Sequence, residues 1–426
     1  MTSETRKPRA PLTLGLRLAL LAEYGVLPFA RRHLLGRRAR GKEDPDRWAE
    51  KLAQGQAERP DGPLVWLHGV GLGEVLALRG LVAALGRHRP DLHFLVTSSS
   101  FSAGTAIERN LPDRCRHQYL PLDLPGIAGR FLDHWRPDLA VWTDQEIWPR
   151  LAMQLQRRGI PQAMVAARLA KGSAASRGQF TSFYRGLYRL PDMIEAQDQH
   201  SAEVLGQRAG RKVAVTGSLK PAAAPLAPSA AHDTIAAHLA GRDIWLLASS
   251  HPADESIALA AQAAVCKAHP APLLIIAPRD PRRGPEIAAT AQGRGLATCL
   301  RTTLADIGTQ VWVADSFGEL GTWYRLARVA LIGGSFDDTE GHNPWEAAVL
   351  DTAILHGPRT ANFAADYARL AAAGAARCVT TAADVCATLA DPGLGRLADK
   401  ARAEAAIAAQ AVDGIAARLI DLMEQG

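Results

Sequence analysis

The chain has 426 residues, of which 47% are hydrophobic and 22% charged, a composition typical of globular proteins and not of disordered or fibrous ones. This length is too great for one compact core and predicts two domains of ordinary size. The five cysteines are scattered without a C-x-x-C pair, which indicates free thiols in a reducing compartment. The net charge of +6 is moderate, so its placement is more informative than its size.

The N-terminal segment, residues 1–45, joins an apolar stretch (12–29) to a basic cluster. Arg17, Glu23 and Pro28 interrupt the apolar stretch, which is unsuited to a spanning helix or a cleavable signal. We expect a helix in the headgroup region, with the basic cluster on anionic lipid. The alternative is a helix packed on its own domain. Nucleic acid is not expected, because no aromatic residues interleave with the basic ones. The cluster comprises Arg31, Arg32, Arg37, Arg38, Arg40 and Lys42.

Short apolar runs alternate with helical patterns from Pro63 onward, as in buried parallel strands. A linker of small residues and prolines at 222–232 separates two sets of such units. The sequence therefore predicts an α/β protein with two Rossmann-like, doubly wound domains facing a cleft, at 46–221 and 233–394. A final helix over 395–426 is expected to pack across the domain junction. The expected strands cover 63–68, 93–98, 138–143, 161–167, 243–249, 271–278, 311–315, 328–334 and 352–357.

A glycine-rich loop, HGVGLGE at 68–74, follows the first expected strand. Ligands of doubly wound folds bind at loops that follow strands. Glu74 begins the next helix, where it either caps the helix or acts as a general base. The glycine spacing differs from G-x-G-x-x-G, so a dinucleotide site is not expected.

Two further segments supply charge to the first domain. Asp144 and Glu146 follow the strand at 138–143. They are either helix caps or groups that hold a polar acceptor and stabilise positive charge on a sugar ring. Lys220 precedes the linker, where it either neutralises an anion or is a solvated hinge lysine.

The second domain carries the loop GGSFDDTEGHNPWEAA at 333–348. Pro344 and Glu346 form a ready helix start, whose backbone amides can bind phosphate while the carboxylate accepts from ribose hydroxyls. This pattern predicts a nucleotide-sugar pocket. His251 lacks a partner at metal spacing, which favours a hydrogen-bonding role over a metal ligand. Further candidates around this pocket are Ser250, His251, Arg279, Arg282, Arg283 and His342.

Taken in order, these loops resemble the transferases that attach 3-deoxy-D-manno-octulosonic acid (Kdo) to lipid A. HGVGLGE resembles the H-S-V-S-V-G-E of that family, DQEIWPR (144–150) its E-T-E-L-W-P-N, and GSLK (217–220) its G-N-L-K. In the second half, PRDP (278–281) resembles P-R-H-P, FGEL (317–320) resembles M-G-E-L, and TEGHNPWE (339–346) resembles G-G-H-N-P-x-E. The ordered series spans nearly the whole chain from about residue 15.

The resemblance implies an inverting GT-B glycosyltransferase that uses neither metal nor cofactor and acts in lipopolysaccharide core biosynthesis. The implied donor is CMP-Kdo and the implied acceptor a lipid A precursor, lipid IVA. The implied location is the cytoplasmic face of the inner membrane of a Gram-negative bacterium. Glu74 would deprotonate the acceptor hydroxyl, while Glu146 and Lys220 would stabilise an oxocarbenium-like transition state. The implied CMP-binding residues, expected to meet Glu74 over the cleft, are Pro278, Arg279, Phe317, Gly318, Glu319, Asn343, Pro344 and Glu346.

Several residues in or near the expected cleft depart from the family pattern. Asp280 replaces a histidine, Arg150 an asparagine, and Gly69 and Gly71 two hydroxyl-bearing residues, while the segment 166–176 lacks the polar residues of N-A-R-L-S. Two other functions are therefore kept open. One is transfer of a sugar from a UDP-sugar donor. The other is binding of nucleotide or lipid without catalysis, which the negative charge of Asp280 suggests.

Overall fold

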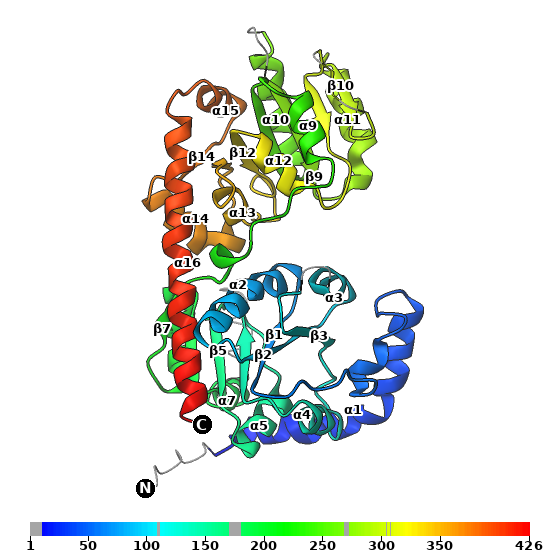
Figure 1. Ribbon diagram of the computed structural model, residues 1–426, viewed down its shortest axis with the longest axis vertical. Coiled ribbons are helices and arrows are strands. Elements are labelled where there is room, and N and C mark those ends of the chain that lie inside the picture. The colour runs from blue at the N-terminus through cyan, green and yellow to red at the C-terminus, as the bar shows by residue number, and fades with distance from the viewer. Residues whose placement is uncertain (1–10, 109–110, 170–179, 268–271, 304, 307) are drawn as a thin grey trace. The chain divides into compact units, whose positions relative to one another are not determined.

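The computed structural model describes residues 11–108, 111–169, 180–267, 272–303, 305, 306 and 308–426 (Figure 1). The chain divides into two compact units, residues up to 224 together with 409–426, and residues 225–408. Most of the segment 166–176, singled out above as a departure, lies outside the described residues.

Within the described residues, the first unit is a seven-stranded parallel sheet in the order β3-β2-β1-β4-β5-β6-β7. Its strands are β1 (Leu64–Gly69), β2 (His93–Ser98), β3 (Cys115–Tyr119), β4 (Leu139–Thr143), β5 (Gln162–Ala167), β6 (Met193–Ala196) and β7 (Ala214–Val215). Its helices are α1 (Leu14–Ala39), η1 (Trp48–Leu52), α2 (Leu72–His88), α3 (Phe101–Glu108), α4 (Ile127–Trp135), α5 (Pro149–Arg158), α7 (Thr181–Leu187), α8 (Gln199–Ala209) and η2 (Lys220–Ala222).

The strands β1, β2, β4 and β5 are buried almost throughout on both faces, which explains their continuous apolar runs. Successive side chains of a strand point to opposite faces. Leu64 and Trp66 of β1 accordingly join a core with α1, α4, α5, α7 and α8. Val65 and Leu67 join a separate core with α2, α3 and the end of α16 (Leu394–Glu424).

Helix α1 is anchored to the first unit along one side and exposed along the other. Leu16, Leu20, Ala30 and Leu34 are buried in the core. Arg150 of α5, itself buried, forms an ion pair with Glu23 of α1 and donates to the Leu20 carbonyl at 2.6 Å. Arg150 is thus occupied in holding α1. The exposed side carries Leu14, Leu18, Leu21, Tyr24, Val26, Phe29 and Leu35.

In the part of the chain that the structure describes, no helix combines the length and apolar character needed to cross a membrane.

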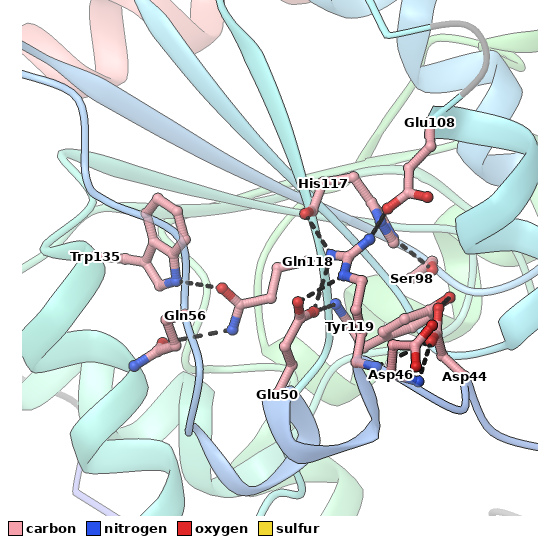
Figure 2. A network of polar contacts seen from close by, with 11 residues as sticks. Asp44, Asp46, Glu50, Gln56, Ser98, Glu108, His117, Gln118, Tyr119 and Trp135 are labelled. Atoms are coloured by element: carbon pink, nitrogen blue, oxygen red, sulfur yellow. Dashed lines mark hydrogen bonds and ion pairs between the residues drawn. The ribbon is translucent and has the colours of Figure 1, made fainter.

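A polar network fastens the segment after α1 to strand β3 (Figure 2). Glu50 accepts from Arg47 at 2.7 Å and from the Tyr119 backbone N–H at 2.9 Å, and Arg47 also pairs with Glu108. His117 contacts the Ser98 hydroxyl at 2.9 Å. Burial, together with the positive charge of Arg47, lowers the pKa of His117 to about 3, so this imidazole is neutral at pH 7.

The second unit repeats the architecture, and its described residues form a seven-stranded parallel sheet in the order β10-β11-β9-β8-β12-β13-β14. Its strands are β8 (Ile244–Ser250), β9 (Leu273–Pro278), β10 (Thr298–Leu300), β11 (Val311–Val313), β12 (Val329–Ile332), β13 (Ala353–His356) and β14 (Ala376–Cys378). Its helices are α9 (His232–His238), α10 (Pro252–Val265), η3 (Pro281–Arg283), α11 (Gly284–Gly293), α12 (Leu320–Leu326), α13 (Trp345–Ala348), η4 (Ala361–Phe363), α14 (Ala364–Ala372), α15 (Ala382–Leu389) and the first part of α16.

The last helix contributes to the cores of both units. Ala401, Ala405 and Ala408 of α16 belong to a core of the second unit, whereas Ile415 and Leu419 belong to a core of the first. Two α/β units with doubly wound parallel sheets confirm the predicted fold class, that of GT-B enzymes.

Each sheet has a switch point at its centre, where the connections that leave two neighbouring strands lead in opposite directions. In the first sheet it lies between β1 and β4, and in the second between β8 and β12. Ligands of open α/β sheets bind beyond the carboxyl ends of the strands at such points. The loops after these four strands are therefore where the topology places function.

Candidate functional site

A pocket of the first unit lies at the β1/β4 switch point. Glu74, at the start of α2, Asp144, directly after β4, and Lys220 line it together. The sheet topology thus brings together three residues that span 146 positions of the sequence, from 74 to 220. The other lining residues are Ala77, Thr143, Ala166, Gln197, Ser218 and Leu219.

The carboxylate of Glu74 caps its own helix. Its Oε2 accepts from the Gly71 backbone N–H at 3.1 Å, in the third helical position where a capping glutamate is found. A Cβ built on Gly71 would lie 2.8 Å from that Oε2 atom. The absence of a side chain at Gly71, one of the departures noted above, therefore permits this conformation of Glu74.

Asp144 is held in an uncommon backbone conformation. Its φ of 58° lies in the left-handed region, as does the φ of 47° of Ala166, which lines the same pocket. Non-glycine residues in this region carry strain, and such strain clusters at functional sites. Burial raises the pKa of Asp144, the positive charge of Lys220 opposes that shift, and the charge of Glu74 adds to it. The charges of Glu74, Asp144 and Lys220 therefore influence one another.

Glu146 does not line this pocket. Its Oε2 atom is buried and lies 3.6 Å from Nε2 of His68, the last residue but one of β1. His68 opens the HGVGLGE loop, yet sequence reasoning assigned it no role. The available signal was its place at the end of a strand expected to precede a site.

In the second unit, the loops after β8 and β12 are tied together by Asp254. Its buried carboxylate accepts from the backbone N–H groups of His251 at 2.9 Å, Gly334 at 2.7 Å and Ser335 at 3.2 Å. Gly334 has a φ of 66°, and a Cβ there would lie 2.8 Å from the side chain of Thr339. A glycine is therefore required for this turn. Sequence reasoning missed Asp254, which is the carboxylate in the third position of α10.

His251 and His342 form a stacked pair beside this turn. Their rings lie 5.2 Å apart with an angle of 21° between their planes, and their Nε2 atoms are 3.0 Å apart. One ring therefore donates to the other. Burial, together with the electrostatic effects of the neighbouring His251 and Arg279, lowers the pKa of His342 to about 4, so His342 is neutral at pH 7. Arg279, whose side chain is exposed, is then the permanent cation of this group.

Glu346 lies within range of the same arginine. The Asn343 amide donates to Glu346 at 3.3 Å, and Asn343 accepts from the Trp345 backbone N–H at 3.2 Å, with Pro344 between them. Burial raises the pKa of Glu346, against the opposing effects of Asn343 and the charge of Arg279. The structure thus gathers His251, His342, Arg279, Asn343 and Glu346 around one switch point.

The loop after β11 is organised differently. Both oxygens of Glu319 accept from Arg301, each at 2.9 Å, and Ser316 also donates to this carboxylate. Arg301 packs over the rings of Trp312 and Trp323. Phe317 is 81% exposed, and Gly318 has a φ of 82°. Glu319 therefore braces this loop through Arg301, which sequence reasoning missed.

The remaining polar candidates have partners elsewhere. The Ser250 hydroxyl donates to Glu255 at 2.8 Å, and Arg283 pairs with both oxygens of Glu255. Pro278 ends β9 and is buried. Asp280 forms a two-point ion pair with Arg282, at 2.9 and 2.8 Å, which lowers the pKa of Asp280. The negative charge that motivated a non-catalytic function is thus balanced locally.

Among the described residues, no three His, Cys, Asp or Glu side chains gather as a metal site.

Comparison with known proteins identifies the family of this chain. The family model described as 3-deoxy-D-manno-octulosonic-acid transferase (kdotransferase) matches residues 46–223. A probable mitochondrial Kdo transferase of Arabidopsis thaliana is 30% identical over 362 residues, covering 82% of this chain and 80% of the relative. The chain belongs to the Kdo transferase family. It is a glycosyltransferase, and the resemblance inferred from the ordered loops is confirmed.

A bacterial relative agrees with this assignment, and a solved structure agrees with the fold. The Kdo transferase of Bordetella pertussis is 34% identical over 337 residues, covering 76% of this chain and 78% of the relative. A glycosyltransferase of Rickettsia africae covers 85% of this chain and 99% of its own, with 8% identity and a TM-score of 0.55. At that identity the structural similarity supports the fold alone. The Kdo transferase family acts in lipopolysaccharide biosynthesis, and so does this member.

Proposed function

We propose that this Kdo transferase moves Kdo from CMP-Kdo to a lipid A precursor, lipid IVA, with inversion and without a metal. The observation that carries the proposal is the pocket at the β1/β4 switch point, where Glu74 shares space with Asp144 and Lys220. A carboxylate on a rigid helix start suits a general base for an acceptor hydroxyl. The adjacent cation and second carboxylate suit the charge that develops as the anomeric bond breaks.

The donor is assigned to the switch point of the second unit. CMP-Kdo carries one phosphate and a carboxylated sugar, both negative. Arg279 supplies permanent positive charge, and Asn343 and Glu346 offer polar groups to a ribose. Because Glu319 is paired with Arg301, we assign it to holding the 316–319 loop rather than to direct nucleotide contact.

The acceptor is a lipid, and the exposed side of α1 suits a membrane surface. Leu14, Leu18 and Leu21 recur at helical spacing and are 70%, 57% and 64% exposed. Exposed arginines follow at 31, 32, 38 and 40. An apolar stripe beside basic residues is the pattern of a helix that lies in the headgroup region. We propose that this helix holds the enzyme at the cytoplasmic face of the inner membrane.

The decisive experiment compares Glu74→Gln with wild type on CMP-Kdo, generated in situ, and tetraacylated lipid IVA. The glutamine can still accept from Gly71, so folding is preserved, but it cannot take a proton. Loss on the order of a thousandfold in kcat is expected for removal of a general base. Retention of wild-type turnover would remove Glu74 as the base.

A parallel assay with UDP-sugars tests the alternative donor, and an assay in EDTA tests the independence from metal.

Membrane association is tested separately by flotation with vesicles of phosphatidylglycerol or of phosphatidylcholine alone. Wild type is expected to float with the anionic vesicles, and Leu18→Glu/Leu21→Glu to stay behind. Both positions are exposed, so the double variant should keep the wild-type melting temperature. Equal flotation of the two proteins would contradict the assignment of α1.

A further inference from the structure

Neighbouring residues hold the buried imidazole ring of His68 in place, except at its Nε2 atom. The ring of His68 is 1% exposed. Its Nδ1 lies 3.1 Å from the Thr97 carbonyl oxygen and 3.0 Å from the Thr97 hydroxyl. The indole of Trp142 meets the ring edge-on at 6.1 Å, and the His68 carbonyl accepts from Thr143 at 2.7 Å.

The remaining nitrogen of His68 faces a carboxylate. Nε2 lies 3.6 Å from Oε2 of Glu146, and both atoms are buried without another hydrogen-bond partner in the described part of the chain. Only 32% of the Glu146 side chain is exposed. Two buried polar atoms that face each other without a further partner are costly unless they are bonded to each other.

His68 Nε2 and Glu146 Oε2 can bond directly only if a hydrogen lies between them. The Thr97 hydroxyl accepts from the Trp66 indole at 2.9 Å, so its single proton goes either to Nδ1 of His68 or to the Leu67 carbonyl. In the first case Nδ1 accepts, and the neutral ring carries its proton on Nε2, directed at Glu146. In the second case Nδ1 can donate to the Thr97 carbonyl or hydroxyl, and a neutral ring then has no proton on Nε2. The first arrangement makes His68 a hydrogen-bond donor to Glu146, and it is the arrangement that relieves both buried atoms.

We propose that His68 is a positioning residue for Glu146, holding its Oε2 inside the protein and so fixing where the rest of the carboxyl group points. This inference rests on the proposed function together with the expectation, from the family resemblance, that Glu146 stabilises the transition state. A separation of 3.6 Å is long for a hydrogen bond. Contacts of this kind lengthen in unliganded enzymes and tighten in the reacting complex.

Two isosteric substitutions separate the two nitrogens of the ring. The amide nitrogen of His68→Gln lies where Nε2 was and can still donate to Glu146. The amide of His68→Asn lies where Nδ1 was and reaches only Thr97. We expect His68→Asn to lower kcat on the order of tenfold to a hundredfold with an unchanged KM for CMP-Kdo. His68→Gln should stay within about threefold of wild type. Equal losses in the two variants, or no loss in either, would overturn the proposal.

Three further measurements make the test independent of the proposed function and of folding. Glu146→Gln alone tests whether Glu146 matters, and full activity of that variant contradicts its catalytic assignment without reference to His68. If Glu146→Gln is impaired, His68→Asn should add no further loss in the double variant, whereas an additive loss would refute the coupling. The ¹⁵N shift of His68 Nε2 in folded wild type should change in Glu146→Gln, and an unchanged shift would also refute it.

Discussion

The backbone N–H of Gly71 donates to the carboxylate of Glu74 at 3.1 Å, and a side chain on Gly71 would collide with the carboxylate oxygen that accepts this bond. The acid proposed as the base is thus held by the turn that precedes its own helix. In the family motif that this loop resembles, a serine stands at that position. The orientation of Glu74 is therefore a local property of this sequence.

Gly71→Ala should displace the Glu74 carboxylate from its cap and lower kcat. The colliding atom is the end of a flexible side chain, so the loss of stability should stay near the value of one cap, about 1 kcal/mol. The measurement pairs turnover with the melting temperature. Gly73→Ala is the matched control, because a Cβ at Gly73 meets nothing within 4 Å. That control should gain up to about 1 kcal/mol from helix propensity and keep its turnover. Equal turnover in the two variants would argue against a constrained Glu74.

Arg150→Asn restores the residue of the family motif and should loosen α1. Asparagine is too short to reach both Glu23 and the Leu20 carbonyl, so a half-buried carboxylate loses its partner at a cost of about 1–3 kcal/mol. Limited proteolysis should then cleave within α1 faster than in wild type. Arg158→Ala on the same helix is the control, since its partner Asp133 is 68% exposed and such pairs contribute below about 1 kcal/mol. Unchanged protection of α1 would mean that its apolar contacts suffice.

His117 should make the first unit less stable in mild acid. Its pKa is about 3 in the folded protein and about 6.5 when unfolded, so between these values the unfolded chain binds the extra proton. The contribution is complete above pH 6.5 and falls as the pH drops, by about 1 kcal/mol between pH 7 and pH 5.5. Calorimetry of wild type and His117→Gln should show a smaller fall in the variant over this range. Parallel curves would indicate that the folded imidazole accepts the proton.

Arg301→Lys should raise the KM for CMP-Kdo more than it lowers kcat. Lysine cannot reproduce the two parallel bonds to Glu319, so the 316–319 loop loses its brace while the charge is kept. Steady-state kinetics with varied donor would show this, and a change of about tenfold corresponds to 1.4 kcal/mol. Arg282→Lys, which alters an exposed pair on the neighbouring loop, should leave the KM within twofold. A loss confined to kcat would instead place Glu319 in the chemical step.

The central strands could be predicted from sequence because each is a continuous apolar run. The strand predicted at 93–98 coincides with β2, and the other expected runs differ from the observed strands by one to three residues at their ends. β3 was missed because its sequence, CRHQY, is polar and lies at a sheet edge, where the network of Figure 2 satisfies it. The short strands β7, β10 and β14 lack the length for a periodic signal.

The site residues were visible as separate loops, but not their grouping. The pocket contains Glu74, Asp144 and Lys220 only because β1 and β4 are neighbours in the sheet. The order of strands in a sheet cannot be predicted from the local sequence of each strand. For the same reason the pairing of Arg301 with Glu319, and that of His68 with Glu146, required coordinates. Asp144 and Glu146 looked equivalent in sequence, yet only Asp144 lines the pocket.

Helix α16 has a consequence for how the protein is made. Its closing turns supply Val412, Ile415 and Leu419 to the interior of the first unit, although some 180 residues of the second unit are synthesised before them. During translation, the core of the first unit therefore lacks these α16 side chains until the second unit has been synthesised. A premature stop after residue 408 would remove Val412, Ile415 and Leu419 from the core that α2 and α3 form with the first sheet, so a lesion beyond the second unit would weaken the domain that is translated first.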